Sequence, residues 1–189
     1  TNIDRCDPIF LDCGTNPVGG STIIFNEDFE NIKSNSALIT AGWSNINRNV
    51  KSTKFKSKSS SGNRIMELSA YNSGESPLEV WLVSPSINLD ATTNEALTFE
   101  TNTGYDNGKV MTVYISSDFS GNMNTANWVQ LDVALSEGPS SGYGSSFTSS
   151  GSINLSCLSG GVHVAFRYVG DDGGVTTTFQ IDNVKVTGN

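Results

Sequence analysis

Strict alternation of apolar and polar residues dominates this chain and is clearest near its C-terminal end. Val164, Phe166 and Tyr168 alternate with Ala165 and Arg167, which is the pattern of a half-buried strand. The same reasoning predicts strands at residues 23–29, 48–58, 64–71, 79–84, 96–101, 110–116, 128–133, 152–155, 162–168 and 176–186. No stretch of ten residues shows a helical period. Short strands at this spacing predict an all-β protein, a β-sandwich of two antiparallel sheets.

The last predicted strand carries an irregularity. Phe179 and Ile181 share one parity, whereas Val184 and Val186 share the other, so the apolar face switches between the two pairs. A strand keeps one face buried through such a slip only where a bulge inserts one residue. The sequence therefore predicts a bulge that places Asp182 one step from the sheet edge.

Size and charge narrow the class of protein. The 189 residues and 20.1 kDa suit one domain with a sizeable core. We expect residues 1–21 to be a linker or the end of a preceding domain, and residues 22–189 to be the β-sandwich module. A net charge of −8 argues against nucleic acid as a partner. The chain contains no apolar run of about 18 residues, which is the length that would predict membrane insertion. The chain begins with Thr rather than Met, which indicates a processed or excised piece of a larger protein.

The chain contains three cysteines, an odd number, so at least one cannot be paired with another within the chain. Cys6 and Cys13 stand seven apart in a segment containing Pro and Gly, and a disulfide between them would close a small loop. Two reduced cysteines in a linker are the alternative. Cys157 is then left over, and we expect it to pack as a small buried hydrophobic residue.

Several segments resemble one group of domains. In chain order they read NEDFE at 26–30, GW at 42–43, WLVSPSINL at 81–89, LTF at 97–99, FRYVG at 166–170 and TTTFQIDNVKV at 176–186. They resemble choice-of-anchor J and cleaved-adhesin domains, which belong to the MAM-like and carbohydrate-binding jelly rolls of secreted Bacteroidetes-type proteins. The resemblance covers about residues 22–187. It implies a jelly-roll sandwich, a secreted or cell-surface location, and a non-catalytic module carried by a larger parent protein.

The resemblance also implies a calcium site. In the jelly rolls that this chain resembles, the first and last strands lie side by side and an ion between them holds the termini. Glu30 and Asp182 match motif positions, and Asp28 is a weaker third. Ca²⁺ takes oxygen ligands of this kind, and clustered acids without a cation would repel one another. The alternative is that these acids simply point into solvent.

Catalytic chemistry finds little support in the sequence. His163 is the single histidine, lies within a predicted strand, and is expected to have a packing role. No candidate nucleophile lies beside this histidine in the sequence, and the Cys and His residues are too few for a zinc site. Paired carboxylates for glycoside hydrolysis are a matter of spatial arrangement, so a polysaccharide-degrading domain stays as a third reading. We therefore expect no enzyme and assign no catalytic residue.

One candidate ligand surface is aromatic. With the apolar residues of their strands in the core, Trp81, Tyr114 and Arg167 are expected to face outward, together with His163. Aromatic rings stack on the apolar faces of sugars, while a guanidinium group bonds hydroxyl or carboxylate groups. The alternative is that a loop covers this face and makes Trp81 structural.

The second candidate surface is basic. Six of the eleven Lys and Arg residues fall within residues 48–64, and Lys54, Lys56 and Lys58 alternate with Phe55 and Ser57 along a predicted strand. Such a ladder suits the uronate or sulfate groups of an anionic polysaccharide. Lysines on an edge strand also prevent edge-to-edge aggregation, which is the alternative explanation.

These observations predict a calcium-stabilised, non-catalytic module that recognises a polysaccharide, with an anionic one favoured. The main alternative is an adhesin-type interaction domain or spacer without a glycan ligand.

Overall fold

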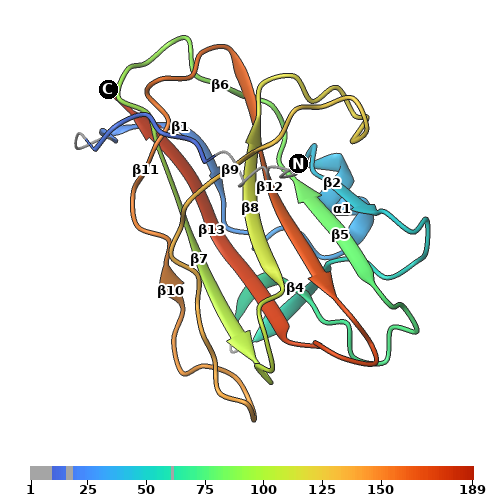
Figure 1. Cartoon of the computed structure of the whole chain (residues 1–189). Coiled ribbons are helices and arrows are strands. Elements are labelled where there is room, and N and C mark those ends of the chain that lie inside the picture. Colours follow the sequence, from blue (N-terminus) through green and yellow to red (C-terminus); the bar gives the residue numbers. More distant parts are fainter. Residues whose placement is uncertain (1–9, 16–18, 61) are drawn as a thin grey trace, which may run out of the picture.

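The structure is a computed structural model that describes residues 10–15, 19–60 and 62–189. Two antiparallel sheets pack face to face in a β-sandwich of the jelly-roll type, as the sequence predicts (Figure 1). The six-stranded sheet has the order β2-β5-β12-β8-β9, with β6 beside β12. Its strands are β2 (Ser44–Asn47), β5 (Leu78–Val83), β6 (Ile87–Asn88), β8 (Met111–Ser116), β9 (Val129–Gln130) and β12 (Gly161–Gly170).

The seven-stranded sheet has the order β10-β7-β13-β4-β3, with β1 beside β13 and β11 beside β7. Its strands are β1 (Thr22–Glu27), β3 (Lys56–Ser60), β4 (Asn63–Leu68), β7 (Ala96–Gly104), β10 (Thr148–Ser149), β11 (Ile153–Asn154) and β13 (Thr178–Gly188). Among the described residues, no helix is long and apolar enough to cross a membrane.

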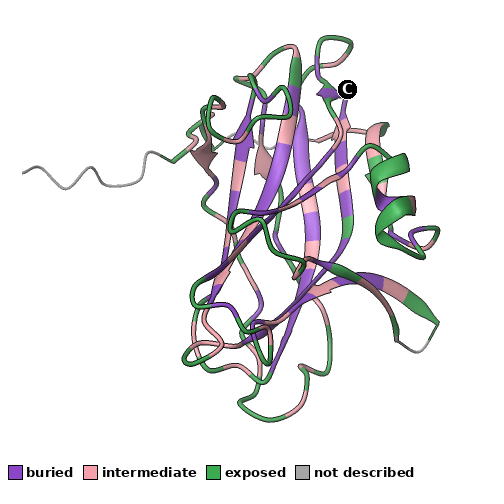
Figure 2. Cartoon of the chain, turned by 90° about the vertical axis from the view of Figure 1, so that its right-hand side faces the viewer, coloured by how far each residue is buried: buried purple, intermediate pink, exposed green. Residues whose placement is uncertain are grey.

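The main core lies between the two sheets, and the strand alternation produces it. Val164, Phe166 and Tyr168 of β12 are fully buried, as the pattern predicts. The ring of Phe166 packs edge to face against the ring of Phe99, which comes from the opposite sheet. The two ring centroids are 5.1 Å apart. In Figure 2 the buried residues follow the central strands of the sandwich. Each fully buried large apolar side chain contributes about 1.5–3 kcal/mol to folding.

The predicted bulge in β13 is confirmed. The pairing of β13 with β7 changes register between Asp182 and Lys185, and Asn183 has a φ of 51°. Asn tolerates this left-handed conformation better than most residues do. As a result, Ile181 and Val184 both stay fully buried on the core side. The first and last strands are neighbours, since β1 pairs with β13.

The secondary structure of residues 35–60 differs from the prediction. A short helix, α1 (Asn35–Thr40), was not expected, and at six residues it is too short to show a helical period. Its N-terminus is capped by Ser34, whose Oγ accepts a hydrogen bond of 3.1 Å from the backbone of Ala37. The single strand predicted over 48–58 is also wrong, because β2 ends before it and β3 begins only at Lys56.

The predicted Cys6–Cys13 disulfide is wrong. Cys13 is bonded to Cys157, 144 residues away in sequence, and Cys157 is exposed rather than buried. Cys6 lies outside the described residues. The Nδ2 group of Asn154 donates to the carbonyl of Cys13 over 2.8 Å, so the bridge joins segments that already lie together. Closing so long a loop lowers the entropy of the unfolded chain by an equivalent of about 5 kcal/mol.

Candidate ligand-binding surfaces

The outer face of the six-stranded sheet is covered. The connection between β8 and β9 folds across it and brings Phe119 and Trp128 onto Trp81. The ring centroids of Trp81 and Trp128 are 5.4 Å apart, as are those of Phe119 and Trp128. Trp81 is only 7% exposed as a result. The expectation of an open aromatic platform is therefore wrong, and the alternative of a loop-covered face holds.

Polar groups beneath this loop bind one another. The Glu79 carboxylate accepts hydrogen bonds from Trp81 Nε1 over 2.8 Å and from Arg167 Nε over 3.0 Å. The Arg167 guanidinium carbon lies 5.6 Å from the centre of a Trp81 ring. Burial alone would raise the pKa of Glu79, but the two hydrogen bonds and the positive charge of Arg167 outweigh it and lower that pKa.

The remaining residues of this face also have internal partners. Tyr114 stacks beside Trp81, with ring centroids 5.2 Å apart. The Nδ1 atom of His163 lies 2.8 Å from the carbonyl oxygen of Ser84, and its ring meets Phe119 edge to face at 5.2 Å. His163 therefore has the packing role predicted for it. Trp81, Tyr114 and Arg167 are brought together as expected, but by packing rather than around open space.

The outer face of the seven-stranded sheet, in contrast, has an open groove of about 290 Å³. The Lys58 ammonium group lies 2.9 Å from Glu67 Oε1, 2.9 Å from the hydroxyl of Tyr143 and 4.9 Å from the centre of the Tyr143 ring. Burial lowers the pKa of Lys58, but its bonds to Tyr143 and Glu67 raise the pKa more, so Lys58 stays charged. Tyr143 is 38% exposed, and its ring meets the ring of exposed Tyr105 at 5.6 Å. The groove thus offers aromatic and cationic groups to solvent.

Buried amides hold the loop of Tyr143 on the sheet. Asn102 Nδ2 donates to the carbonyl of Gly144 over 3.1 Å and to Gln180 Oε1 over 3.3 Å. Gln180 Nε2 in turn donates to Glu67 over 2.7 Å. The sequence did not single out Tyr143. An aromatic residue within the Gly- and Ser-rich stretch 136–150 is the signal that points to it.

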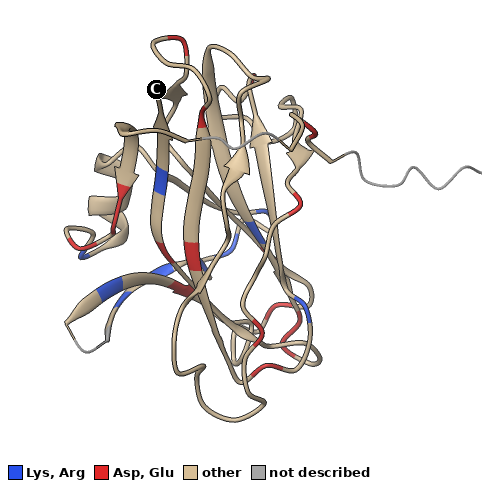
Figure 3. Cartoon of the chain, turned by 90° about the vertical axis from the view of Figure 1, so that its left-hand side faces the viewer, with Lys and Arg blue, Asp and Glu red and all other residues tan. Residues whose placement is uncertain are grey.

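The predicted lysine ladder is only partly formed. Lys56 and Lys58 lie on β3, an edge strand of the sheet, whereas Lys54 precedes the strand. Lys56 is exposed, and within the described ranges neither Lys54 nor Lys56 forms an ion pair. Figure 3 shows basic residues along the β3–β4 hairpin with an acidic one at its base, and acidic residues on β7 and β13 with one further basic residue on β13. The face is therefore mixed in charge, with its positive part at the edge.

Asp182 is the most buried of the predicted calcium ligands, with 1% of its surface exposed. Burial raises its pKa, and the nearby charges of Glu100 and Glu30 act in the same direction. The side chain of Asn63 and the backbone of Asn183 donate to its two oxygens over 2.8 Å each, which only partly offsets this rise. A buried carboxylate near two other acids is a place where a cation would relieve repulsion.

Glu30 and Asp28, the other two predicted calcium ligands, are less well placed to bind an ion than Asp182. Glu30 Oε1 accepts a hydrogen bond of 2.7 Å from the backbone of Arg64, and exposed Asp28 accepts one of 3.1 Å from the backbone of Glu30. In the part of the chain that the structure describes, no three His, Cys, Asp or Glu side chains are grouped closely enough to hold a metal. The donor set fits Ca²⁺ only if amide, carbonyl or water oxygens complete the shell around Asp182 and Glu30.

Solved structures with a similar fold include cleaved-adhesin domains of Lys-gingipain from Porphyromonas gingivalis. The K3 domain aligns with a TM-score of 0.58 and 20% identity, covering 88% of this chain and 99% of that one. The K1 domain aligns with a TM-score of 0.59 and 15% identity, covering 87% and 98%. A carbohydrate-binding module solved with β-1,4-galactotriose reaches a TM-score of 0.48 at 12% identity, covering 89% of this chain and 100% of that one.

No family model matches the chain, and no curated protein matches it either. The expected likeness to cleaved-adhesin domains is found at the level of the fold. The choice-of-anchor J assignment stays a prediction.

Proposed function

We propose that this module binds a polysaccharide chain, without catalysis, in the groove on the outer face of the seven-stranded sheet. The observation that carries the proposal is the exposed Tyr143 ring beside the Lys58 ammonium group. An aromatic ring packs against the C–H face of a sugar, and the ammonium group donates to sugar hydroxyls or carboxylates. Exposed Ser145 and Ser146 line the same groove and add hydroxyl partners.

A preference for anionic glycans is part of the proposal and depends on the edge of the sheet. Glu67 already compensates the charge of Lys58, so the uncompensated positive charge next to the groove comes from Lys56 and Lys54. An anionic chain that crosses the groove would meet them at β3. The same proposal includes a calcium ion held by Asp182 and Glu30, which would supply positive charge at the acidic end of this face and stabilise the fold.

The proposed location is secreted or cell-surface, with the module attached to a larger parent protein. The Cys13–Cys157 disulfide supports an oxidising compartment. The alternative, an adhesin-type interaction domain or spacer without a glycan ligand, is favoured by the sealed face around Trp81, which leaves one sheet without an exposed aromatic platform.

A glycan array decides between the two, followed by affinity measurements on the polysaccharides that bind. Tyr143→Ala should weaken binding by at least about tenfold, as expected when a stacking ring worth about 1.4 kcal/mol is lost. The matched control is Tyr71→Ala, which removes a more exposed tyrosine (70% against 38% for Tyr143) from the connection between β4 and β5. Equal loss in both variants, or no glycan bound by the wild type, would favour the spacer.

A further inference from the structure

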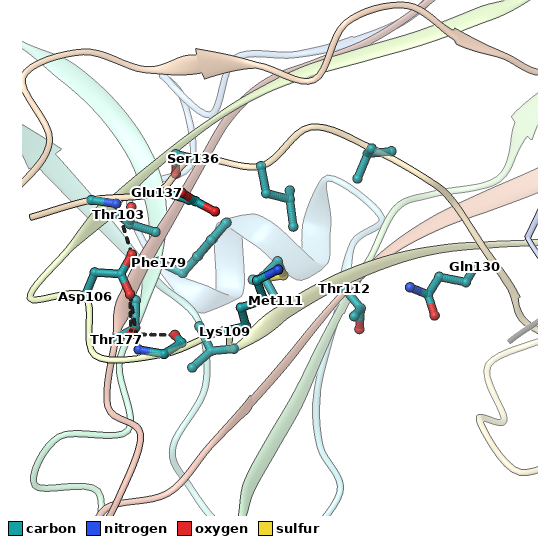
Figure 4. A pocket seen from close by; sticks show the side chains of 15 residues that line it. Thr103, Asp106, Lys109, Met111, Thr112, Gln130, Ser136, Glu137, Thr177 and Phe179 are labelled. Atoms are coloured by element: carbon teal, nitrogen blue, oxygen red, sulfur yellow. Dashed lines mark hydrogen bonds between the residues drawn. The ribbon is translucent and has the colours of Figure 1, made fainter. Parts of the chain in front are cut away.

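A pocket of about 550 Å³ lies where the β7–β8 connection, the segment after β9 and the start of β13 meet (Figure 4). Its wall includes the buried side chains of Val110, Met111 and Phe179. The volume falls in the range of about 300–1,000 Å³ that small-molecule sites occupy. The pocket therefore has the size and the apolar wall of a ligand site, and no sequence pattern predicted it.

Two hydroxyl groups in this pocket have no hydrogen-bond partner among the residues that the structure describes. Thr103 is 2% exposed and Ser136 is 7% exposed, and within the described residues neither hydroxyl makes a hydrogen bond. The backbone N–H of Ser136 is satisfied, since it donates to Thr101 Oγ1 over 3.0 Å. A buried hydroxyl without a partner costs about 1–3 kcal/mol. The fold therefore holds two hydroxyl groups in the pocket that a bound molecule would satisfy.

Charged groups on the rim add donors and acceptors. Lys109 and Glu137 line the pocket, are exposed, and form no ion pair in the described part of the chain. Asp106 has a different role, because it accepts hydrogen bonds from the backbones of Gly108 and Gly138 over 3.2 and 3.0 Å. Asp106 thus ties the two loops of the pocket together. The groups left for a ligand are a donor, an acceptor and two hydroxyls that can act as either.

We propose that this pocket is a second binding site, which takes one or two sugar units at the end of a glycan chain. Sugar hydroxyls both donate and accept, so they can satisfy Lys109, Glu137 and the two buried hydroxyls together. The C–H face of a pyranose ring matches the apolar wall. A simple anion would leave Glu137 without a partner and a simple cation would leave Lys109 without one, so neither fits as well.

The pocket is separate from the groove on the outer face. Thr103 and Asn102 are neighbours on β7, and side chains of successive strand residues point to opposite faces. Thr103 lines the pocket, and Asn102 lines the groove. The inference rests on the proposed function only for the class of ligand. Different variants and different probes therefore test the two sites.

Titration of the isotope-labelled chain with glucose, galactose, mannose and xylose, followed by NMR, tests the inference. We expect at least one sugar to shift the backbone amides of Gly108, Val110 and Gly138. The double variant Thr103→Val/Ser136→Ala should weaken that sugar's affinity about tenfold or more, because each lost hydrogen bond is worth about 1 kcal/mol. Tyr143→Ala, which removes a side chain of the groove and none that lines the pocket, should leave these shifts unchanged.

Thermal unfolding of the same double variant supplies a readout without a ligand. Because the lost hydroxyls have no partner in the fold, the melting temperature should stay the same or rise. A clear fall would show that the hydroxyls are already satisfied and would overturn the inference. So would the absence of shifts with every sugar, equal affinity in the double variant, or stronger shifts with a zwitterionic amino acid such as glycine. Loss of polysaccharide binding in Tyr143→Ala with the pocket shifts intact would separate the two sites.

Discussion

The outer faces of the two sheets share the same strand alternation and reach opposite outcomes. On the six-stranded sheet, the β8–β9 connection packs aromatic rings over Trp81 and leaves Arg167 and Glu79 bonded to each other. On the seven-stranded sheet, the loop of Tyr143 is held by buried amides and leaves an open groove beside Lys58. Alternation decides which residues face outward, whereas the connections decide which of them meet solvent.

Removing the central ring of the sealed face should give the largest effect on folding. Trp81→Ala is expected to lower the free energy of unfolding by about 3–5 kcal/mol, because the loop cannot fill the space that the indole leaves. Urea unfolding followed by circular dichroism measures this loss. Binding of any polysaccharide that the wild type recognises should persist while the variant is folded. A variant of full stability that no longer binds glycans would reverse the roles of the two faces.

Removing calcium should weaken the other face. If an ion bridges Asp182 and Glu30, free calcium at about a thousand times its dissociation constant adds about 4 kcal/mol of stability, and a chelator should remove it. Asp182→Asn should abolish this response, whereas the control Asp132→Asn, at an exposed acid, should keep it. The calcium hypothesis fails if chelator leaves the melting curve unmoved and elemental analysis finds no metal.

Acid should loosen the sealed face through Glu79. The pKa of Glu79 is lower in the folded state than in the unfolded chain, so Glu79 makes its full contribution to the free energy of unfolding above the ordinary pKa of about 4.3. This contribution is lost as the pH falls through the folded value. Glu79→Gln should therefore lower stability at neutral pH by about 1–2 kcal/mol and flatten the decline below about pH 5.

Denaturant titrations at several pH values measure the slope of the free energy of unfolding against pH. Arg167→Gln removes one of the two donors to Glu79 and should flatten the slope in part. An unchanged slope in Glu79→Gln would show that other carboxylates control the acid response.

The lysines at β3 should have the smallest effect on folding. Lys54→Ala/Lys56→Ala/Lys58→Ala is expected to change stability by less than about 1 kcal/mol per residue, because exposed charges contribute little. Affinity for alginate or a sulfated galactan should fall, and the difference from wild type should shrink at high salt, where the Debye length is about 3 Å. The control Lys33→Ala removes an exposed lysine from another part of the surface. Equal affinities would leave β3 with the role of edge protection.

Much of the fold could be predicted because it depends on local alternation. The parity change between Ile181 and Val184 identified the bulge, since only an inserted residue keeps both side chains in the core. The disulfide could not be predicted, because the fold brings Cys13 to a residue 144 positions away in the sequence. The pocket hydroxyls of Thr103 and Ser136 could not be predicted either, as serine and threonine are common throughout the chain.

Prediction of the two surfaces failed for a related reason. Trp81 was correctly placed on the outward side of its strand, but nothing in its own segment shows that residues 117–128 fold over it. Lys58 was correctly placed on an outward face, yet its partners Glu67 and Tyr143 come from another strand and a distant loop. Burial of an outward side chain is a property of the neighbouring connections, and these have no sequence period.

The Cys13–Cys157 bond also determines how the module transmits mechanical load. When tension is applied to the two ends of the chain, the covalent bridge carries it directly from Cys13 to Cys157. The strands from β1 to β11 lie within the closed loop and are not stretched along the backbone. Force along the backbone reaches only β12 and β13, so the parts of the groove and the pocket that are loaded first are Gln180 and Phe179 of β13.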